Sequence, residues 1–223
     1  MATTRMETIT FSVAKAHKAQ TCLSEKIVTE DRLPSKIKLV GGIDVSYGDE
    51  NAVGAAVVLD YESLSLVEFQ TAVCKVKFPY VPTLLSFREI PAAVACIRKL
   101  NLQPDVFLVG GQGLAHPCRC GFASHLGLAV GKPTIGVAKS RLIGEPTKIG
   151  EDVFLVHGGQ VVGSVVTTKE GAKPVYVSVG HLVSLATAVK IVKDCTRDSR
   201  LPEPLLWAHR IATEEKNRRK LNS

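Results

Sequence analysis

The chain has 223 residues, of which 45% are hydrophobic and 22% are charged, as in an ordinary globular protein. This length suits one domain with a sizeable core, since cores divide only beyond roughly 250 to 300 residues, and no apolar run approaches the roughly 20 residues needed to cross a bilayer. The formal net charge of +7 favours a polyanionic partner, although charge alone is weak evidence.

The first six residues, Met1 to Met6, lack the apolar core of a secretory signal peptide, so we expect a cytoplasmic protein with no membrane partner. The six cysteines have no disulfide-framework spacing and are expected to be reduced thiols. His116, Cys118 and Cys120 are spaced like metal ligands, but no second pair is spaced to complete a structural zinc site. We therefore interpret that group as a coincidence.

The first half of the chain is predicted to form a helix and then an antiparallel meander. Spaced apolar positions among Ala, Lys, Gln and Glu indicate an amphipathic helix over residues 11–27, inside a helical N-terminal segment, 6–30. Three β-branched and apolar stretches follow, separated by turn-like polar residues. They span residues 37–47, 52–60 and 64–77.

The second half alternates strand and helix patterns, which predicts an α/β fold with a mixed sheet flanked by helices. The predicted strands span residues 105–109, 134–138 and 175–179, and a hairpin over 153–168 turns at Gly158-Gly159. The predicted helices span residues 91–100, 122–130 (ending at Gly131), 183–194 and 203–216. A basic tail, 216–223, closes what we expect to be a single domain, 1–223.

Asp44 is the first residue that could carry chemistry. The period of two along a strand places it with Gly42 and Ser46 on a small, polar face. A carboxylate on a largely covered strand is costly unless it is paired or bound to a cation. The residues alone leave two readings equally open: a metal ligand, or an Asp held by a buried Arg or by backbone amides.

Two further candidates precede the predicted helix 91–100. Glu89 lies close to the helix start, where the helix dipole alone would favour a carboxylate. Tyr80 lies between Pro79 and Pro82, which stiffen the loop and hold the ring outward in a form suited to stacking on bases or wedging between them. A packed loop tyrosine is the alternative.

A glycine-rich stretch, residues 110–113, ends a predicted strand and leads to His116. Backbone can approach a ligand closely there, but no Gly-Lys-Ser/Thr follows, so the stretch is not a phosphate loop of the Walker type. Lys139 and Ser140 follow strand 134–138, at the edge where open α/β sheets bind ligands. Two interpretations of these residues are equally open: contact with a phosphate group, or a polar turn exposed to solvent.

His209 lies on a predicted helix, in one stripe with Leu205 and Ala212, which directs it toward the sheet. Two interpretations are open for this residue: a core histidine whose hydrogen bonds are made within the protein, or a ligand.

The order and spacing of several motifs together resemble the endonuclease V family. The motifs are, in chain order, Gly42-Ile43-Asp44-Val45-Ser46-Tyr47, Pro79-Tyr80-Val81-Pro82, Phe87-Arg88-Glu89, Gly111-Gln112-Gly113-Leu114-Ala115-His116-Pro117, Ala123-Ser124-His125-Leu126-Gly127, Gly136-Val137-Ala138-Lys139-Ser140-Arg141-Leu142, Tyr176-Val177-Ser178-Val179-Gly180-His181 and Leu201-Pro202-Glu203-Pro204. So many collinear motifs, over most of the chain, are far more specific than any one of them.

The resemblance implies a ribonuclease H-like fold and a Mg²⁺-dependent or Mn²⁺-dependent endonuclease that acts in DNA repair. It implies recognition of a deaminated purine, chiefly hypoxanthine, and hydrolysis of the second phosphodiester bond on its 3′ side. The partner is then DNA with deaminated adenine, or inosine-containing RNA, and we expect a monomer. The resemblance assigns catalysis to Asp44, Glu89, His209 and Lys139, and substrate binding to Tyr80, Pro79, Pro82, Gly113, His116 and Ser140.

One departure from the family's pattern affects the metal site. The metal ligands implied are Asp44, Glu89 and an aspartate that follows the strand in Val-Asp-Gly-Gln/His-Gly, and this chain has Gly110 at that place. Asp105 is no substitute, because five residues of strand separate it from position 110 by roughly 16 Å and turn it to the opposite face. Smaller departures also remove cations: Cys118, Leu182 and Leu206 stand where arginines are common, and Val179 replaces a proline.

These departures leave three hypotheses: an active repair nuclease, a lesion-binding protein whose cleavage is impaired, or a variant disabled by one substitution at Gly110. Losing one of two or three carboxylates weakens metal binding and misplaces the activated water. We therefore predict severely reduced cleavage.

Overall fold

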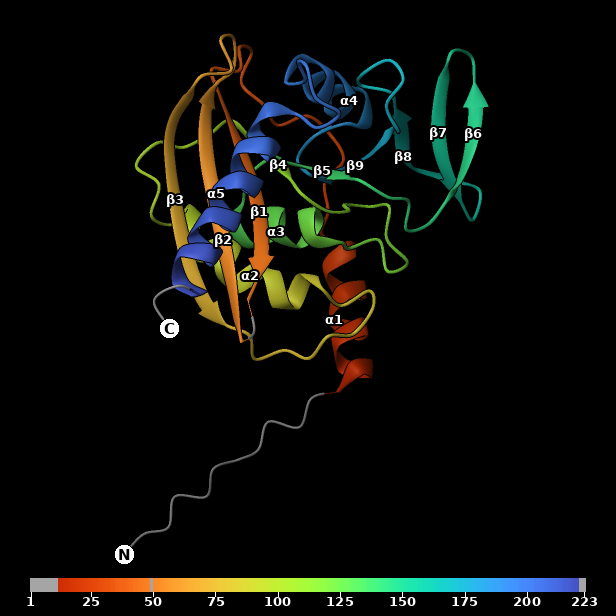
Figure 1. Ribbon diagram of the computed structural model, residues 1–223. Coiled ribbons are helices and arrows are strands. Elements are labelled where there is room, and N and C mark those ends of the chain that lie inside the picture. Colours follow the sequence, from red (N-terminus) through yellow and green to blue (C-terminus); the bar gives the residue numbers. More distant parts are fainter. Residues whose placement is uncertain (1–11, 49, 221–223) are drawn as a thin grey trace, which may run out of the picture.

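The computed structural model describes residues 12–48 and 50–220, which form one mixed sheet with helices on both faces (Figure 1). Within these residues the strand order is β3-β2-β1-β4-β5-β9-β8-β7-β6. Helices α4 and α5 cover one face, where Val57, Leu108 and Ile135 belong to a large apolar core. Helices α2 and α3 cover the other face, over Ile43 and Phe107. No helix within the described ranges has the length and apolar character of a membrane span.

The predicted meander is confirmed. It consists of β1 (Leu39–Tyr47), β2 (Asn51–Asp60) and β3 (Leu66–Lys75), and both pairings are antiparallel. On β1, the alternation predicted from the sequence places Ile43 in the core under α2 and α3, and turns Gly42 toward α5. Asp44 therefore faces the side of the sheet that α5 covers.

The α/β alternation places two parallel strand ends side by side. Strand β4 (Val106–Val109) runs parallel to β1, and β5 (Thr134–Ala138) runs parallel to β4. Helix α3 (Phe122–Val130) connects them and ends, as predicted, at Gly131 in the left-handed region with φ 64°. The carboxyl ends of β4 and β5 thus open at one edge of the sheet, next to the middle of β1.

The remaining strands extend the sheet beyond β5. Strand β9 (Val175–His181) pairs antiparallel with β5, and β8 (Gln160–Val166) pairs with β9 and with β7 (Asp152–His157). The predicted turn at Gly158-Gly159 is confirmed, with φ of 59° and 75°. Strand β6 (Glu145–Ile149) was not predicted, because all five of its residues are exposed and no buried side creates an apolar alternation.

Helix α2 (Ser86–Ile97) corrects the prediction of a helix over residues 91–100, because it begins five residues earlier. The prediction placed Pro91 in the first turn, where proline is best tolerated. In the structure the ring of Phe87 stacks on Phe78 and meets His125 edge-on, and this tertiary packing holds a helical turn ahead of the proline. Glu89 consequently lies in the first turn of α2.

The C-terminal helix corrects a second prediction. Helix α4 (Leu185–Asp194) lies where expected, but α5 (Glu203–Lys220) runs through residues that were assigned to a basic tail, 216–223. Arg218 and Arg219 pair with the buried carboxylate of Glu215, at 2.5 and 2.7 Å, and these i,i+3 and i,i+4 contacts support the last turns. Residues 221–223 lie outside the described ranges.

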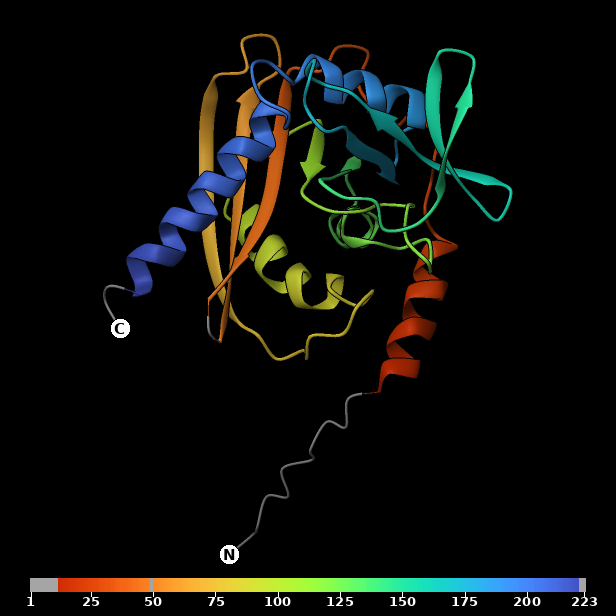
Figure 2. The same cartoon turned by 45° about the vertical axis from the view of Figure 1, so that its right-hand side comes forward.

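Helix α1 (Val13–Ser24) lies away from the sheet, packed near α3 (Figure 2). It falls within the predicted range 11–27, and the first residues of the predicted segment 6–30 lie outside the described part of the chain. The side chain of Ser12 caps the helix by accepting a hydrogen bond from the backbone N–H of Lys15.

Candidate functional site

Two adjoining cavities lie at the carboxyl ends of β4 and β5. The acidic pocket, of about 200 Å³, is lined by Asp44, Gly110, Gly111, Val137, Ala138, Lys139, Leu201, Leu205 and His209. The loop pocket, of about 270 Å³, is lined by Thr83, Leu85, Ser86, Glu89, Gly110, Gly111, Gln112, His116, Gly121, Phe122, Ala138, Ser140, Arg141 and Leu142. Most residues predicted to form the site therefore line one of two neighbouring cavities.

Asp44 is held by a histidine rather than by an arginine. The start of α5 packs so tightly on β1 that a Cβ at Gly42 would lie 2.0 Å from the carbonyl oxygen of Pro204. This close packing carries His209 over β1, where its Nδ1 lies 2.7 Å from Asp44 Oδ2. Of the two readings left open for His209, the core histidine is excluded, because its side chain is 53% exposed.

The electrostatic environment of Asp44 is mixed. Burial raises the pKa of its carboxyl group, and the hydrogen bond from His209 and the charge of Lys139 act in the opposite direction. Lys139 is anchored at the end of β5, because its carbonyl oxygen accepts a hydrogen bond of 2.5 Å from Arg200 Nη2. Arg200 was not singled out in the sequence, where nothing distinguishes it from the other basic residues.

Glu89 lies within electrostatic reach of Asp44. Burial, followed by the negative charge of Asp44, raises the pKa of Glu89 to about 8. Two acidic groups in one desolvated site cannot both ionise cheaply, and a bound cation would relieve that repulsion. Tyr47, which was not predicted as a site residue, adjoins Glu89; burial and the charge of Glu89 raise its pKa.

Gly110 lies directly against Asp44. Its backbone N–H donates to the carbonyl oxygen of Ile43 at 2.9 Å, and a Cβ on Gly110 would lie 2.7 Å from Asp44 Oδ1. A side chain at this position would therefore enter the acidic pocket beside the Asp44 carboxylate. That carboxylate now extends into the space which such a side chain would fill.

The donor set does not fit a metal ion held by three protein side chains. Among the residues that the structure describes, no group of three or more His, Cys, Asp or Glu side chains is placed to hold one. Asp105 is committed elsewhere, since its Oδ2 accepts from the backbone N–H groups of Lys38 and Leu39 at 2.8 and 3.1 Å. Gly110, next to Asp44, contributes no side chain to this set.

The loop pocket contains a neutral histidine with a defined tautomer. His116 Nε2 lies 2.9 Å from the carbonyl oxygen of Thr83, which can only accept, so this nitrogen carries the proton. The other ring nitrogen, Nδ1, accepts from the backbone N–H of Cys118 at 3.2 Å. Burial lowers the pKa of His116 to about 4. The ring therefore holds two loop segments together as a neutral group.

Two predicted binding residues have different surroundings. Ser140 is exposed and lines the loop pocket, and its carbonyl oxygen accepts from Gln112 Nε2 at 3.0 Å. Gly113 is buried, and its N–H donates to Ser178 Oγ at 2.8 Å. A Cβ on Gly113 would lie 2.0 Å from the carbonyl oxygen of Val179, so this glycine packs the loop against β9 and does not line either pocket.

The Pro-Tyr-Val-Pro loop, residues 79–82, lies outside both pockets and ends next to Thr83. The side chain of Tyr80 is 68% exposed, which excludes a packed loop tyrosine. Arg88, in the first turn of α2, places its guanidinium carbon 5.9 Å from the Tyr80 ring centre and 5.0 Å from that of Tyr47. The exposed ring is thus available for contact with another molecule.

Ser86 and His125 also belong to the loop pocket and its support, although neither was predicted. Ser86 lines the pocket at the start of α2, and its Oγ lies 3.2 Å from His125 Nδ1. Burial lowers the pKa of His125 to about 4, so the ring is neutral. His125 does lie in one of the quoted motifs, but only the tertiary structure reveals its partner.

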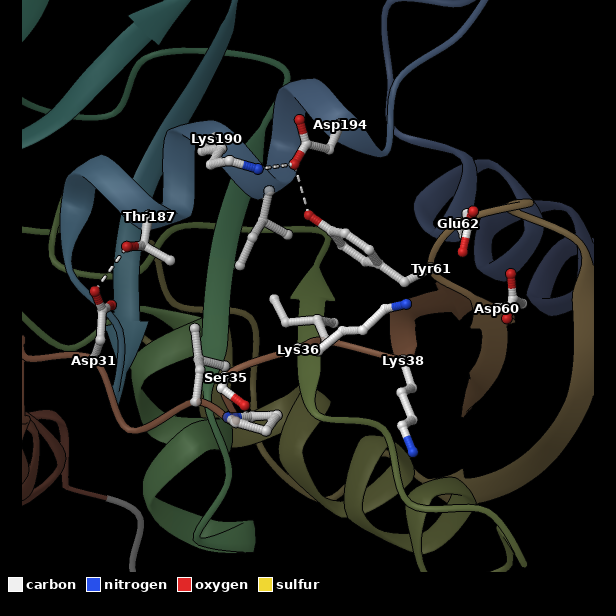
Figure 3. A pocket seen from close by; sticks show the side chains of 14 residues that line it. Asp31, Ser35, Lys36, Lys38, Asp60, Tyr61, Glu62, Thr187, Lys190 and Asp194 are labelled. Atoms are coloured by element: carbon white, nitrogen blue, oxygen red, sulfur yellow. Dashed lines mark hydrogen bonds and ion pairs between the residues drawn. The ribbon is translucent and has the colours of Figure 1, made fainter.

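A larger cavity, of about 1030 Å³, lies between residues 31–38, residues 60–62 and helix α4. We call it the α4 groove (Figure 3). Several of its polar groups bond to one another: Asp194 Oδ2 accepts from Lys190 at 2.5 Å and from Tyr61 at 2.8 Å, and Thr187 donates to Asp31 at 2.7 Å. None of the predicted site residues lines it, so its size alone does not mark it as the functional site.

Known proteins resemble this chain over most of its length. The family model described as Endonuclease V matches residues 21–210. Endonuclease V of Thermofilum pendens is 46% identical over 205 residues, which cover 91% of this chain and 88% of that protein. Endonuclease V of Ignicoccus hospitalis is 45% identical over 205 residues, which cover 92% of this chain and 95% of that protein.

Solved structures agree with these sequence matches. The crystal structure of endonuclease V from Streptomyces avermitilis has a TM-score of 0.86 and 38% identity, and covers 94% of this chain and 95% of its own. Ciona intestinalis endonuclease V, in complex with a 24mer DNA containing an inosine followed by a ribo-adenosine, has a TM-score of 0.84 and 35% identity over 92% of this chain and 98% of its own. Such structures have a ribonuclease H-like fold, and the predicted fold class is confirmed.

Proposed function

This chain belongs to the endonuclease V family of nucleases, and from this premise we propose that it recognises a deaminated purine, chiefly hypoxanthine, in nucleic acid, while its own strand cleavage is severely reduced. The observation that carries the proposal is the glycine beside Asp44: at Gly110 no side chain is present to complete a set of acidic ligands.

Recognition is supported by features that do not depend on position 110. A relative of 35% identity has been solved with inosine-containing DNA, and the net charge of +7 favours a polyanionic strand. The loop pocket offers apolar walls together with Ser86, Gln112 and backbone groups. A base that has left the stack is read by such hydrogen-bonding groups along its Watson–Crick edge, and Tyr80 provides an exposed ring for stacking.

Reduced cleavage is supported by the acidic pocket. Hydrolysis with Mg²⁺ or Mn²⁺ needs carboxylates that fix the ion, and losing one of them commonly raises the barrier by several kcal/mol. Residual cleavage is expected at the second phosphodiester bond 3′ to the lesion, as the family resemblance implies. We also propose that the protein acts as a monomer in the cytoplasm.

A second candidate is a metal-dependent nuclease that remains fully active. It is favoured by the gathering of Asp44, His209 and Lys139 around the acidic pocket, with Glu89 in electrostatic reach. In this case water or substrate oxygens would replace the missing ligand.

Matched strands separate the two candidates. Binding and nicking are measured on single-stranded DNA and RNA that contain either one inosine or one adenosine at the same position, with Mg²⁺ or Mn²⁺. The proteins are the natural chain, Gly110→Asp and Gly110→Ala. Because any Cβ at Gly110 displaces the Asp44 carboxylate, the alanine variant controls for that displacement without adding a carboxylate.

The proposal expects the natural chain to prefer the inosine strand in binding and to nick it slowly, Gly110→Asp to nick much faster, and Gly110→Ala to stay slow. Nicking by the natural chain as fast as by Gly110→Asp would establish the second candidate. Equal binding of inosine and adenosine strands would refute the recognition function.

A further inference from the structure

The residue after the Pro-Tyr-Val-Pro loop has a strained backbone. Thr83 has φ 69°, in the left-handed region that β-branched residues rarely adopt. Such a conformation persists only where the surrounding structure enforces it, and it is concentrated at functional sites. Thr83 lines the loop pocket and follows Tyr80 by three residues. The contacts that hold the Thr83 backbone therefore also position the pocket wall and the Tyr80 loop.

The carbonyl oxygen of Thr83 is held by two donors. One is His116 Nε2 and the other is Nε2 of Gln20, each at 2.9 Å. Gln20 comes from α1 and has no exposed surface. A fully buried amide is costly unless its hydrogen bonds are made.

The hydrogen bonds of Gln20 join two walls of the loop pocket. Its Nε2 also donates to the carbonyl oxygen of Cys120 at 3.2 Å, and Cys120 precedes Gly121, which lines the pocket as Thr83 does. Its Oε1 lies 3.2 Å from His17 Nδ1. Both views in Figures 1 and 2 show α1 beside the loop that leads into α2.

We propose that Gln20 is a positioning residue for lesion recognition: by clamping the strained Thr83 carbonyl to Cys120, it fixes the pocket wall and the Tyr80 loop before a strand binds. This inference rests on the proposed recognition function. Helix α1, which packs near α3 and away from the sheet, thereby takes part in forming the site. Preorganisation of this kind raises affinity, because the loop loses less conformational entropy when the strand binds.

The test uses Gln20→Met, which keeps the length of the side chain and removes its donors and acceptor. Thr21→Ala, on the exposed side of the same helix, is the matched control. Hydrogen exchange of the backbone amides of residues 78–85 is measured without nucleic acid, and affinity is measured on the inosine and adenosine strands. Melting temperatures are recorded so that recognition is compared well below unfolding.

In Gln20→Met we expect faster exchange over residues 78–85 and a loss of inosine affinity on the order of tenfold, with a smaller loss on the adenosine strand. Thr21→Ala should match the natural chain. Adding Thr83→Gly to Gln20→Met should restore much of the inosine affinity, because glycine adopts positive φ without strain. Should Gln20→Met fail to fold, Gln20→Asn, whose shorter amide cannot span both carbonyls, replaces it.

A lower melting temperature with unchanged exchange and unchanged discrimination would overturn the proposal and leave Gln20 a structural residue only. Failure of the recognition function is distinguishable, because the natural chain would then show no preference for inosine. The exchange of residues 78–85 would still decide whether Gln20 holds the loop.

Discussion

The acidic pocket and the loop pocket share Gly110, Gly111 and Ala138, yet they are built from different kinds of group. The polar side chains of the acidic pocket are those of Asp44, Lys139 and His209, and the side chain of His209 is more than half exposed. The walls of the loop pocket are held by partly buried hydrogen bonds to backbone carbonyl oxygens, as at Thr83. Under the proposed function, a missing carboxylate at Gly110 would impair the first pocket while the second kept its shape.

On the proposed function, the same difference would let one chain keep recognition without efficient cleavage. Recognition depends on many packed groups, each of which contributes a small part. Metal-assisted hydrolysis depends on two or three acidic ligands that act as a unit, so their effects do not add. Four experiments test this contrast.

The largest effect is expected from Gly110→Asp. A carboxylate beside Asp44 should raise single-turnover nicking of an inosine strand with Mg²⁺ on the order of a hundredfold, because it completes the acidic set. Affinity for the strand without metal should change little. An equal rate increase in Gly110→Ala would show that displacement of Asp44, and not a third ligand, was responsible.

Tyr80→Ala should weaken binding of the inosine strand by roughly 5-fold to 150-fold, since stacking on one aromatic ring contributes about 1–3 kcal/mol per base. Tyr80→Phe keeps the ring and is expected to bind like the natural chain. Fluorescence anisotropy with a labelled strand measures both. Unchanged affinity in Tyr80→Ala would remove the exposed ring from the recognition surface.

Two partly buried groups at the loop pocket, His125 and Glu89, should respond oppositely to pH. Burial lowers the pKa of His125 to about 4, so between pH 6.5 and 4 the unfolded state binds more protons and stability falls as pH falls. Glu89 has its pKa raised to about 8, so between pH 4.5 and 8 the folded state binds more protons and stability falls as pH rises.

Each group contributes at most about 1.4 kcal/mol per pH unit within its window. Urea unfolding at several pH values should show that His125→Gln flattens the acid side and that Glu89→Gln flattens the neutral side. If the free energy of unfolding depends on pH with the same slope in a variant and in the natural chain, the substituted residue does not titrate as described.

The smallest effect is expected in the α4 groove. Lys38 lines it, and its backbone N–H, which survives substitution, makes the hydrogen bond to Asp105. Lys38→Ala should therefore leave inosine binding within about twofold and the free energy of unfolding within about 0.5 kcal/mol. A larger loss of binding would show that the α4 groove is part of the nucleic-acid interface. Recognition would then not be confined to the loop pocket and the Tyr80 loop.

Sequence reasoning succeeded where local patterns carry the information. The meander, helix α3 with its glycine cap and the hairpin at Gly158-Gly159 follow from residue alternation and turn chemistry. It failed at β6, which has no buried side, and at the start of α2, where the packing of Phe87 outweighs the signal of Pro91. The candidate site residues were predicted from collinear motifs, and the same motifs drew attention to the glycine at position 110.

The sequence by itself determined the fold class, the family and the absence of a side chain at Gly110, because periodicity and motif order are written in the chain. Only the tertiary structure decided that Asp44 pairs with His209, that Asp105 is committed elsewhere and that Gln20 reaches Thr83. Each of these contacts joins residues more than 60 positions apart. Such contacts depend on the packing of whole elements, which no local pattern of residues encodes.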